Sequence, residues 1–581
     1  MQIYQKLFRY VPDKKHFALL AVLFSALSAL LTVTAYYFIY AFIRHILITS
    51  DIERAKHYSL LIAVFIFCGA ISYFFSGYCS HKLAFRLETN LRKRGIDGLT
   101  GAGFRFFDLH PSGLTRKIID DNAAQTHMAV AHLIPDSAYG ILTPILSIAL
   151  GFIVSLKVGV PLLLITLIGF VTLALMMGDQ KFMKIYHKAL EHLSAETVEY
   201  VRGIQVIKIF GTGVTSFKAL HQAITEYAQY AYNYSKSCQR PYVFFQLMFF
   251  GVIALLIPLL LLFTDYRSEP AALSVQLIMT SFLMGVLFVS FMRIMYMSMY
   301  FFQGNNAIDK LETLYSEMGK DALQFGQIEE FENFDIEFEE VCFTYKDTPV
   351  LDQLSFRLEG GKTYALVGSS GSGKSTIAKL ISGFYKIDSG SLKIGGIPIE
   401  NYSKTALIDH IAFVFQDAKL FKKTIYENVR LGRQDASHEE IMKALELAGC
   451  RSILDKFKER EHTLIGSKGI YLSGGERQRI AIARAILKDA DIIIMDEASA
   501  AIDPENEHEL QLAFANLMQG KTVIMIAHRL SSIRKVDEIL VLENGRIIER
   551  GNDESLMNGS TKYKAFQDLY QQANEWRVGN E

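Results

Sequence analysis

The stretch Gly368-Ser369-Ser370-Gly371-Ser372-Gly373-Lys374-Ser375-Thr376 decides how the second half of this chain folds. It follows the apolar run 364–367 and precedes the run 377–381, the order of strand, glycine-rich loop and helix. Glycines let the backbone wrap closely around phosphates, and the N–H groups at the helix start face the anion. Lys374 is expected to reach the outer phosphates, and the Ser375 hydroxyl to bind Mg²⁺. The stretch therefore predicts a nucleoside triphosphate site.

The composition excludes several classes of protein. Lys and Arg number 60, as do Asp and Glu, so the formal net charge is zero and no nucleic-acid partner is expected. The five cysteines are scattered without a Cys-x-x-Cys pair, so neither a disulfide framework nor a zinc site is expected. Half of the residues are hydrophobic, and most long apolar runs lie in the first 300 or so residues. This distribution indicates a membrane half followed by a soluble half.

Six apolar runs are long enough to cross a bilayer as helices, which takes about 20 residues. They cover approximately 16–43, 58–80, 131–156, 158–177, 241–263 and 272–302. The first run has no cleavage pattern after it and is interpreted as a retained membrane helix. Lys and Arg cluster before the first run and after the second, so both places are expected to be cytoplasmic. The short turn between the third and fourth runs is then expected outside.

Two long connections, about 82–128 and 178–240, are charged but keep apolar residues at helical spacing. We expect helices that continue well beyond the membrane. Each has a break near its middle, at 110–113 and at 211–213. A break between two long helices would make a short transverse segment on which a cytoplasmic motor could push; a simple turn is the alternative.

Arg293 lies within the sixth apolar run, where a charge is costly and normally faces a cavity or a partner. It could contact an anionic part of a substrate, or form an ion pair between helices. His132 and Asp136 share a helix face and could bind substrate or relay a proton, or make a structural hydrogen bond. Methionine and aromatic side chains nearby could line an adaptable cavity, although packing between helices is the more common role. The candidate substrate-cavity residues are Arg293, Met295, Tyr296, His132 and Tyr40.

Residues 305–326 are interpreted as a helical linker, and a strand pattern begins at 335. Tyr345 follows that strand pattern and precedes the glycine-rich loop, so its ring could stack on adenine. Gln416 follows the apolar run 411–415, and its amide could reach Mg²⁺ or the attacking water.

Two buried strands end in further candidates. The run 492–495 ends in Asp496, expected to hold Mg²⁺ through water, and Glu497, expected to polarise the hydrolytic water. The run 523–527 ends in His528, which could contact the γ-phosphate. Residues 543–546 are typical of a hairpin turn.

A second anion-binding helix start is expected at Leu472-Ser473-Gly474-Gly475-Glu476-Arg477-Gln478. One chain does not need two such ends for one nucleotide, whereas a face-to-face dimer does. In such a dimer, the second end of each chain would close the partner's ATP site through Ser473, Gly474, Gly475 and Gln478.

With these motifs in place, the chain resembles an ABC transporter half of the exporter-type fold. The resemblance implies a multi-domain chain: a six-helix all-α transmembrane domain (1–304), a linker (305–334) and an α/β P-loop ABC ATPase domain (335–581). It implies ATP and Mg²⁺ as cofactors, Gln416 as the Q-loop, His528 as the switch histidine and coupling helices at the two breaks. The segment 466–469 lacks the usual Glu, and Ala500 stands where the family usually has Ser. Neither departure removes a catalytic group.

Two further segments bear on the substrate. Segments 130–136 and 498–507 look similar to a bacterial subgroup that takes up iron-loaded siderophores, usually as heterodimers of two related halves. This similarity favours siderophore uptake across the bacterial inner membrane, with a heterodimer favoured over a homodimer. Export of lipophilic drugs, lipids or peptides is the alternative. A channel-like or regulatory protein that only binds ATP is disfavoured by the intact Glu497 and His528.

Overall fold

The computed structural model describes residues 2–176, 180–210, 217–251, 254, 269–320, 324–345, 348–383, 385–416, 418–466, 471–496, 504–526 and 533–575. They form two compact units. The helical unit comprises Met1–Ile96 and Gly113–Leu314, and the α/β unit comprises Asp97–Ser112 and Tyr315–Glu581.

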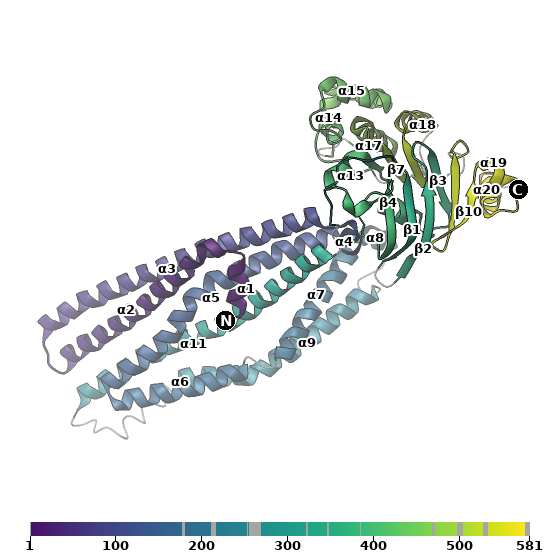
Figure 1. Ribbon diagram of the computed structural model, residues 1–581. Helices are drawn as coiled ribbons and strands as arrows, with labels where there is room; N and C mark the ends of the chain where they lie inside the picture. The colour runs from purple at the N-terminus through teal and green to yellow at the C-terminus, as the bar shows by residue number, and fades with distance from the viewer. Residues whose placement is uncertain are drawn as a thin grey trace. The chain divides into compact units, whose positions relative to one another are not determined.

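Long helices make up the helical unit (Figure 1). Some of them continue beyond its limits. In chain order they are α1 (Gln2–Arg9), a 3₁₀ turn (Pro12–Lys14), α2 (Lys15–Leu47), α3 (Ile52–Gly101), α5 (Ser112–Val154), α6 (Leu156–Met176), α7 (Gln180–Arg202), α8 (Ile204–Phe210), α9 (Lys218–Gln246), a π-helical turn (Leu247–Gly251) and α11 (Pro270–Lys320).

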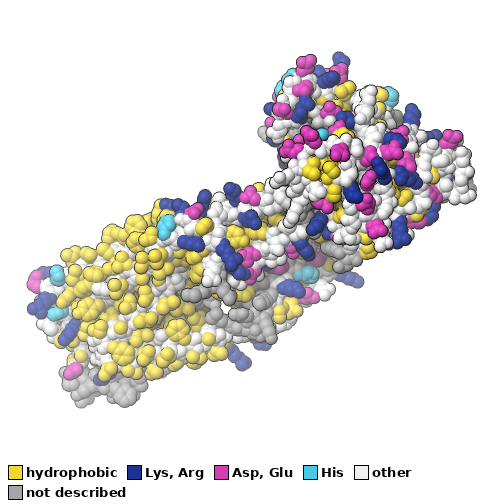
Figure 2. Space-filling view, in the orientation of Figure 1, with side chains coloured by type: hydrophobic (Ala, Val, Ile, Leu, Met, Phe, Trp, Pro, Cys, Tyr) yellow, Lys and Arg dark blue, Asp and Glu magenta, His cyan; other side chains and the backbone are white. Residues whose placement is uncertain are grey.

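Five segments of the described chain are long and apolar enough to cross a membrane: Pro12–Leu47, Ile52–Gly101, Ser112–Val154, Leu156–Met176 and Pro270–Lys320. Many of their large apolar side chains are exposed, and Figure 2 shows these side chains as a broad hydrophobic surface on the helical unit. Such a surface is stable against lipid and not against water. Of the remaining expected span, 241–263, the structure describes only residues 241–251 and 254.

A proline inside α5 illustrates how the helices fit together. Pro135 has no N–H, so the carbonyl four residues earlier, at Ala131, loses its helical partner. The Ser80 hydroxyl of α3 donates to that carbonyl oxygen at 2.9 Å. The Ser25 hydroxyl of α2 donates to the carbonyl of Pro135 itself at 2.5 Å. Neighbouring helices thus satisfy the backbone that the proline disturbs.

The α/β unit holds two sheets. Its strands are β1 (Ile336–Tyr345), β2 (Thr348–Leu358), β3 (Thr363–Gly368), β4 (Ser389–Ile394), β5 (Ile397–Pro398), β6 (Ile411–Val414), β7 (Ile492–Asp496), β8 (Thr522–Ile526), β9 (Glu538–Glu543) and β10 (Arg546–Gly551). The antiparallel sheet has the order β2-β1-β4-β5. The larger sheet has the order β10-β9-β3-β8-β7-β6, in which only β10 is antiparallel to its neighbour.

The described helices of this unit surround the sheets. They are α4 (Phe104–Leu109), α12 (Lys374–Ile381), a 3₁₀ turn (Ile399–Asn401), α13 (Lys404–His410), α14 (Ile425–Arg430), α15 (His438–Leu447), α16 (Arg451–Leu454), a 3₁₀ turn (Arg460–His462), α17 (Gly474–Lys488), α18 (Pro504–Met518), α19 (Asp553–Met557) and α20 (Lys562–Glu575).

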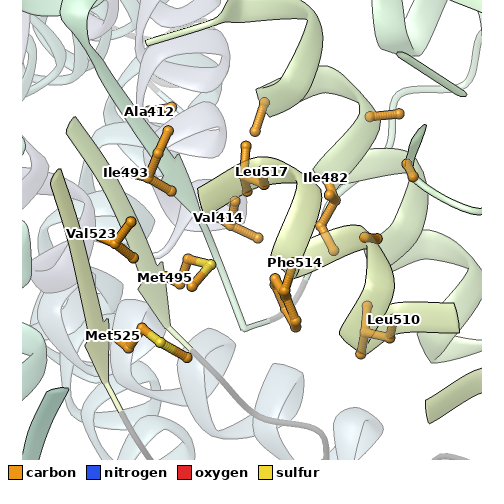
Figure 3. Close-up of a cluster of buried hydrophobic side chains, with 14 of the residues drawn as sticks. Ala412, Val414, Ile482, Ile493, Met495, Leu510, Phe514, Leu517, Val523 and Met525 are labelled. Atoms are coloured by element: carbon orange, nitrogen blue, oxygen red, sulfur yellow. The ribbon is translucent and has the colours of Figure 1, made fainter. Parts of the chain in front are cut away.

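The larger sheet is buried on both faces, which explains its continuous apolar strands. In β7, Ile493 and Met495 join one core cluster while Ile492 and Ile494 join the other. Figure 3 shows the first cluster, where side chains of β6, β7 and β8 meet Ile482 of α17 and Phe514 of α18. This packing holds the carboxyl ends of the parallel strands at one edge.

Local expectations are confirmed at two described places. Asn544 and Gly545 both have positive φ (49° and 76°) in the turn between β9 and β10, as a type I′ hairpin requires. The break expected at 110–113 is present, because α5 begins at Ser112 and the separate helix α4 precedes it. The second break, at 211–213, lies outside the described residues, as do 467–469 and Ala500.

Candidate nucleotide-binding site

The glycine-rich loop joins the carboxyl end of β3 to α12. Its glycines adopt the left-handed conformation, with φ of 152° at Gly368, 83° at Gly371 and 105° at Gly373. A Cβ on Gly368 would lie 2.2 Å from the carbonyl oxygen of Leu542, so only glycine fits there. A Cβ on Gly371 would meet nothing within 4 Å, so this part of the loop faces open space. The loop therefore has the shape of an anion cradle ahead of a helix start.

Lys374 begins α12 and is only 6% exposed. Its Nζ atom donates to the carbonyl oxygens of Gly368 and Ser369, each at 2.8 Å. Burial lowers the pKa of Lys374, while the nearby Asp496 carboxylate acts in the opposite direction. A buried cation inside this loop suits a phosphate chain, so the residues fit a nucleoside triphosphate. Ser372 and Thr376 are buried beside it, whereas Ser375 is exposed.

The other candidate side chains follow neighbouring strands of the same sheet. Asp496 ends β7 opposite Ile526 of β8, and Ile526 in turn lies opposite Leu366 of β3. Asp496 is therefore at the edge where the loop begins, the usual ligand edge of an α/β sheet. Gln416 is exposed two residues after β6 ends. Glu497 and His528 lie outside the described residues.

Tyr345 ends β1 and is half-buried. Its ring lies 4.9 Å from that of Phe343, edge to face, and Lys379 of α12 places its Nζ 6.0 Å from the Tyr345 ring centroid. Because α12 also carries Lys374, the aromatic ring and the phosphate cradle lie beside the same helix.

The second helix start that was expected to bind an anion is that of α17, which begins at Gly474 with Ser473 as its N-cap. The Ser473 hydroxyl accepts from the Glu476 N–H at 3.2 Å, and Glu476 accepts in return from the Ser473 N–H at 2.7 Å. Burial opposes ionisation of Glu476, but hydrogen bonds from Lys456 and Ser473 outweigh it and lower its pKa. Ser473 and Gly474 are exposed, whereas Gly475 is buried. Gln478 is also buried, at 4% exposed, and so does not share the exposed end.

A cluster on α4 was not singled out from the sequence. α4 belongs to the α/β unit, where Asp108 accepts from Lys379 at 3.2 Å and from the Tyr385 hydroxyl. Burial, followed by the hydrogen bond to Asp108, raises the pKa of Tyr385, so the phenol remains a donor. Lys379 thus contacts α4 and lies near the ring of Tyr345, the candidate adenine-stacking residue.

Arg105 is the second anchor of α4. Its guanidinium carbon lies 4.4 Å from the Phe343 ring centroid, and Nη2 forms a 3.1 Å ion pair with Asp388. Phe106 is buried on the same short helix. The mixture of aromatic and charged residues at 104–109, just before the break at 110–113, is a sequence signal from which this helix could have been singled out, but its partners lie about 280 residues away along the chain.

In the helical unit, Arg293 of α11 forms a polar cluster with side chains of α3 and α5. Its Nη1 atom lies 3.2 Å from Asp136 of α5 and 3.0 Å from the Tyr73 hydroxyl of α3. Tyr73 also donates to Asp136 at 3.0 Å. The guanidinium carbon lies 4.3 Å from the Tyr139 ring centroid. The ion-pair alternative for Arg293 is therefore present in the structure.

The other candidate cavity residues do not gather around Arg293 as one group. The His132 ring stacks on Tyr300 with centroids 5.5 Å apart. Tyr40 and Met295 pack against a buried hydrophobic cluster of the helical unit. Tyr296 is 48% exposed. Sequence reasoning gave Asp136 a role beside His132, whereas the structure pairs it with Arg293.

Comparison with known proteins agrees with this arrangement. Residues 18–291 match the ABC transporter transmembrane region, and residues 351–500 match the ABC transporter family. The chain is 32% identical over 522 residues to an ATP-dependent lipid A-core flippase of Pectobacterium atrosepticum, covering 87% of this chain and 86% of the relative. It is 31% identical over 539 residues to a flippase of the same description from Mannheimia succiniciproducens, covering 90% and 89%.

Both halves of the chain are thus matched along nearly their whole length, and the fold of each half agrees with its match. The ATP-binding motifs lie in the matched ATPase half, and the apolar helices lie in the matched membrane half. The chain belongs to the ABC transporter family, as a half-transporter in which a membrane-spanning domain of the exporter-type fold precedes one ATPase domain.

Proposed function

We propose that this chain is half of an ATP-driven exporter that moves an amphipathic lipid with an anionic group. The observation that carries the proposal is similarity through both domains to relatives described as lipid A-core flippases. Iron–siderophore uptake, the favoured expectation from the sequence, gains no support from these relatives. Export of lipids, the alternative, is the function they favour.

The chemistry of the ATPase half follows from the cradle. Bound Mg²⁺·ATP would supply the cleavable phosphate bond. Lys374 would neutralise the outer phosphates, while Ser375 and Asp496 would hold the metal, with Gln416 at its edge. No group of three or more His, Cys, Asp and Glu side chains suited to a metal occurs in the described part of the chain. The metal site would therefore be completed by the nucleotide, as is usual for Mg²⁺.

Hydrolysis would depend on Glu497 and His528, which follow β7 and β8 directly in the chain. Glu497 would polarise the attacking water, and His528 would contact the γ-phosphate. Tyr345 would stack on adenine. The exposed end formed by Ser473 and Gly474 would close the ATP site of a second chain. A second copy of this chain would supply the same exposed end and the same phosphate cradle.

The cargo would meet the membrane half near Arg293. The Arg293–Asp136 pair is 27% and 16% exposed at its side chains, so an anionic group could compete with Asp136 for the guanidinium. Because ATP is cytoplasmic, the ATPase domain and the N-terminus would face the cytoplasm of a bacterial inner membrane, in agreement with the basic residues beside the first two spans.

The test is transport by the full chain in sealed proteoliposomes, with fluorescently labelled lipid A-core or an iron–siderophore complex as cargo. We expect ATP-dependent movement of the lipid to the opposite leaflet. Glu497→Gln should lower ATP turnover about 100-fold or more, because it removes a general base.

Two outcomes would overturn the proposal. One is ATP-dependent accumulation of the iron complex without lipid movement. The other is lipid movement that continues at the same rate in Glu497→Gln particles shown to hydrolyse no ATP.

A further inference from the structure

Two ammonium groups converge where the apolar parts of α2 and α3 end. The Lys82 Nζ atom lies 4.9 Å from the ring centroid of Phe17, and the Lys14 Nζ atom lies 5.7 Å from the same centroid. Lys82 also lies 5.7 Å from the Tyr78 ring centroid. Within the described part of the chain, neither ammonium forms an ion pair with a carboxylate; the exposed Asp13 beside Lys14 forms none either. Like charges gathered around one ring favour an anion beside them.

The position of this pair in the helices identifies the kind of anion. Lys14 immediately precedes α2, and Lys82 follows the apolar run of α3. The two helices are tied together next to the pair, because the Ser76 hydroxyl donates to the carbonyl of Ala21 at 2.6 Å. Both ammonium groups therefore belong to the same border between apolar and charged surface, and Figure 2 shows such a border on the helical unit.

Exposed apolar side chains continue from the two ammonium groups along the same two helices, and we call this strip the apolar lane. Leu19 and Leu23 of α2 are 63% and 56% exposed, and Phe74 and Tyr78 of α3 are 68% and 55% exposed. Phe24 and Phe75 bridge the helices with ring centroids 5.7 Å apart. A ligand here would need an anionic head and apolar tails, and an amphipathic aromatic such as Tyr78 prefers that depth.

We propose that Lys14, Phe17, Tyr78 and Lys82 form a binding site for the phosphate of an anionic phospholipid in the leaflet at this border, with its acyl chains along the lane. The site lies on the outer wall of α2 and α3 and uses none of the residues assigned to ATP or to cargo. It would tie the bound lipid to the α2–α3 pair.

The test is native mass spectrometry of the full chain in detergent with phosphatidylglycerol or phosphatidylcholine added. We expect preferential retention of phosphatidylglycerol. Lys14→Gln and Lys82→Gln should each weaken its binding about fivefold, the effect of one lysine near an anionic surface, and the double variant should weaken it further. Lys82→Arg should retain it.

Lys56→Gln is the matched control, because Lys56 lies at the opposite end of the apolar run of α3 and is paired with Glu53 at 2.7 Å. Unchanged ATP hydrolysis by each variant shows that it is folded. The site would be overturned if the double variant retained phosphatidylglycerol as well as the unmodified chain does. It would also be overturned if Lys56→Gln lost as much phosphatidylglycerol binding as Lys82→Gln. Displacement of the lipid by equimolar inorganic phosphate would show a free-phosphate site instead and would overturn the lipid assignment.

Discussion

At the scale of the residue, the ion pair of Arg293 with Asp136 allows two roles of Arg293, joining helices and binding an anion, to be tested separately. Its guanidinium lies over Tyr139 and pairs with Asp136, so its charge is balanced before any cargo arrives. If the pair only joins helices, removing either charge should lower the stability of the protein by about 3 kcal/mol, because the other charge is left without its partner. If Arg293 also binds an anion, the two single changes should act in opposite directions on cargo.

We therefore predict that Asp136→Asn raises the apparent affinity for an anionic lipid, while Arg293→Gln lowers it. The measurement is lipid-stimulated ATPase activity as a function of lipid concentration, with thermal unfolding followed in parallel. The double variant should recover most of the lost stability, as a coupled pair does. Parallel losses of lipid affinity in both single variants would make the pair structural only.

At the scale of the element, α4 is held by side chains that lie beside the candidate nucleotide-binding site. Lys379 of α12 contacts Asp108 and lies near the Tyr345 ring, and Tyr385 donates to the same Asp108 carboxylate. Because α12 begins at the phosphate loop, a shift of α12 on ATP binding would reach α4 directly. A helix of six residues has little stability of its own and depends on such anchors.

Asp108→Asn should weaken this docking, since hydrogen bonds to charged groups contribute about 1.5–3 kcal/mol. We expect cargo-stimulated ATPase activity to fall about tenfold with the KM for ATP unchanged, measured in proteoliposomes. Asp352→Asn is the control, because Asp352 pairs with Arg546 at an exposed site of the same unit. Full cargo stimulation in Asp108→Asn would show that α4 docking does not control turnover.

At the scale of the whole molecule, the described part of the chain carries a phosphate cradle and an exposed helix end with Ser473 and Gly474. These two features are what the two sides of a shared ATP site require. Two copies would make two complete sites, and the expectation of a heterodimer came only from the siderophore-like segments. The relatives are described as lipid A-core flippases and give no support to the siderophore interpretation on which that expectation rests.

We predict that the purified chain forms a particle of twice 65.6 kDa and hydrolyses ATP without another protein. Light scattering combined with an activity assay on the same fraction measures both. Co-expression with two different affinity tags should yield doubly tagged particles. A monomer that gains ATPase activity only when a different half-transporter is added would establish a heterodimer instead.

Features that depend on short windows of residues can be predicted from the amino-acid sequence alone. The glycine-rich loop, the buried strands of the ATPase, the hairpin at 543–546 and the apolar spans each follow from local spacing and conformational preference. Contacts between distant side chains are visible only in the folded chain. It paired Arg293 with Asp136, buried Gln478 away from the exposed helix end and docked Asp108 on Tyr385, 277 residues further along. Packing in three dimensions determines which charged and hydrogen-bonding groups meet, and the spacing of residues along the chain carries no information about such long-range pairs.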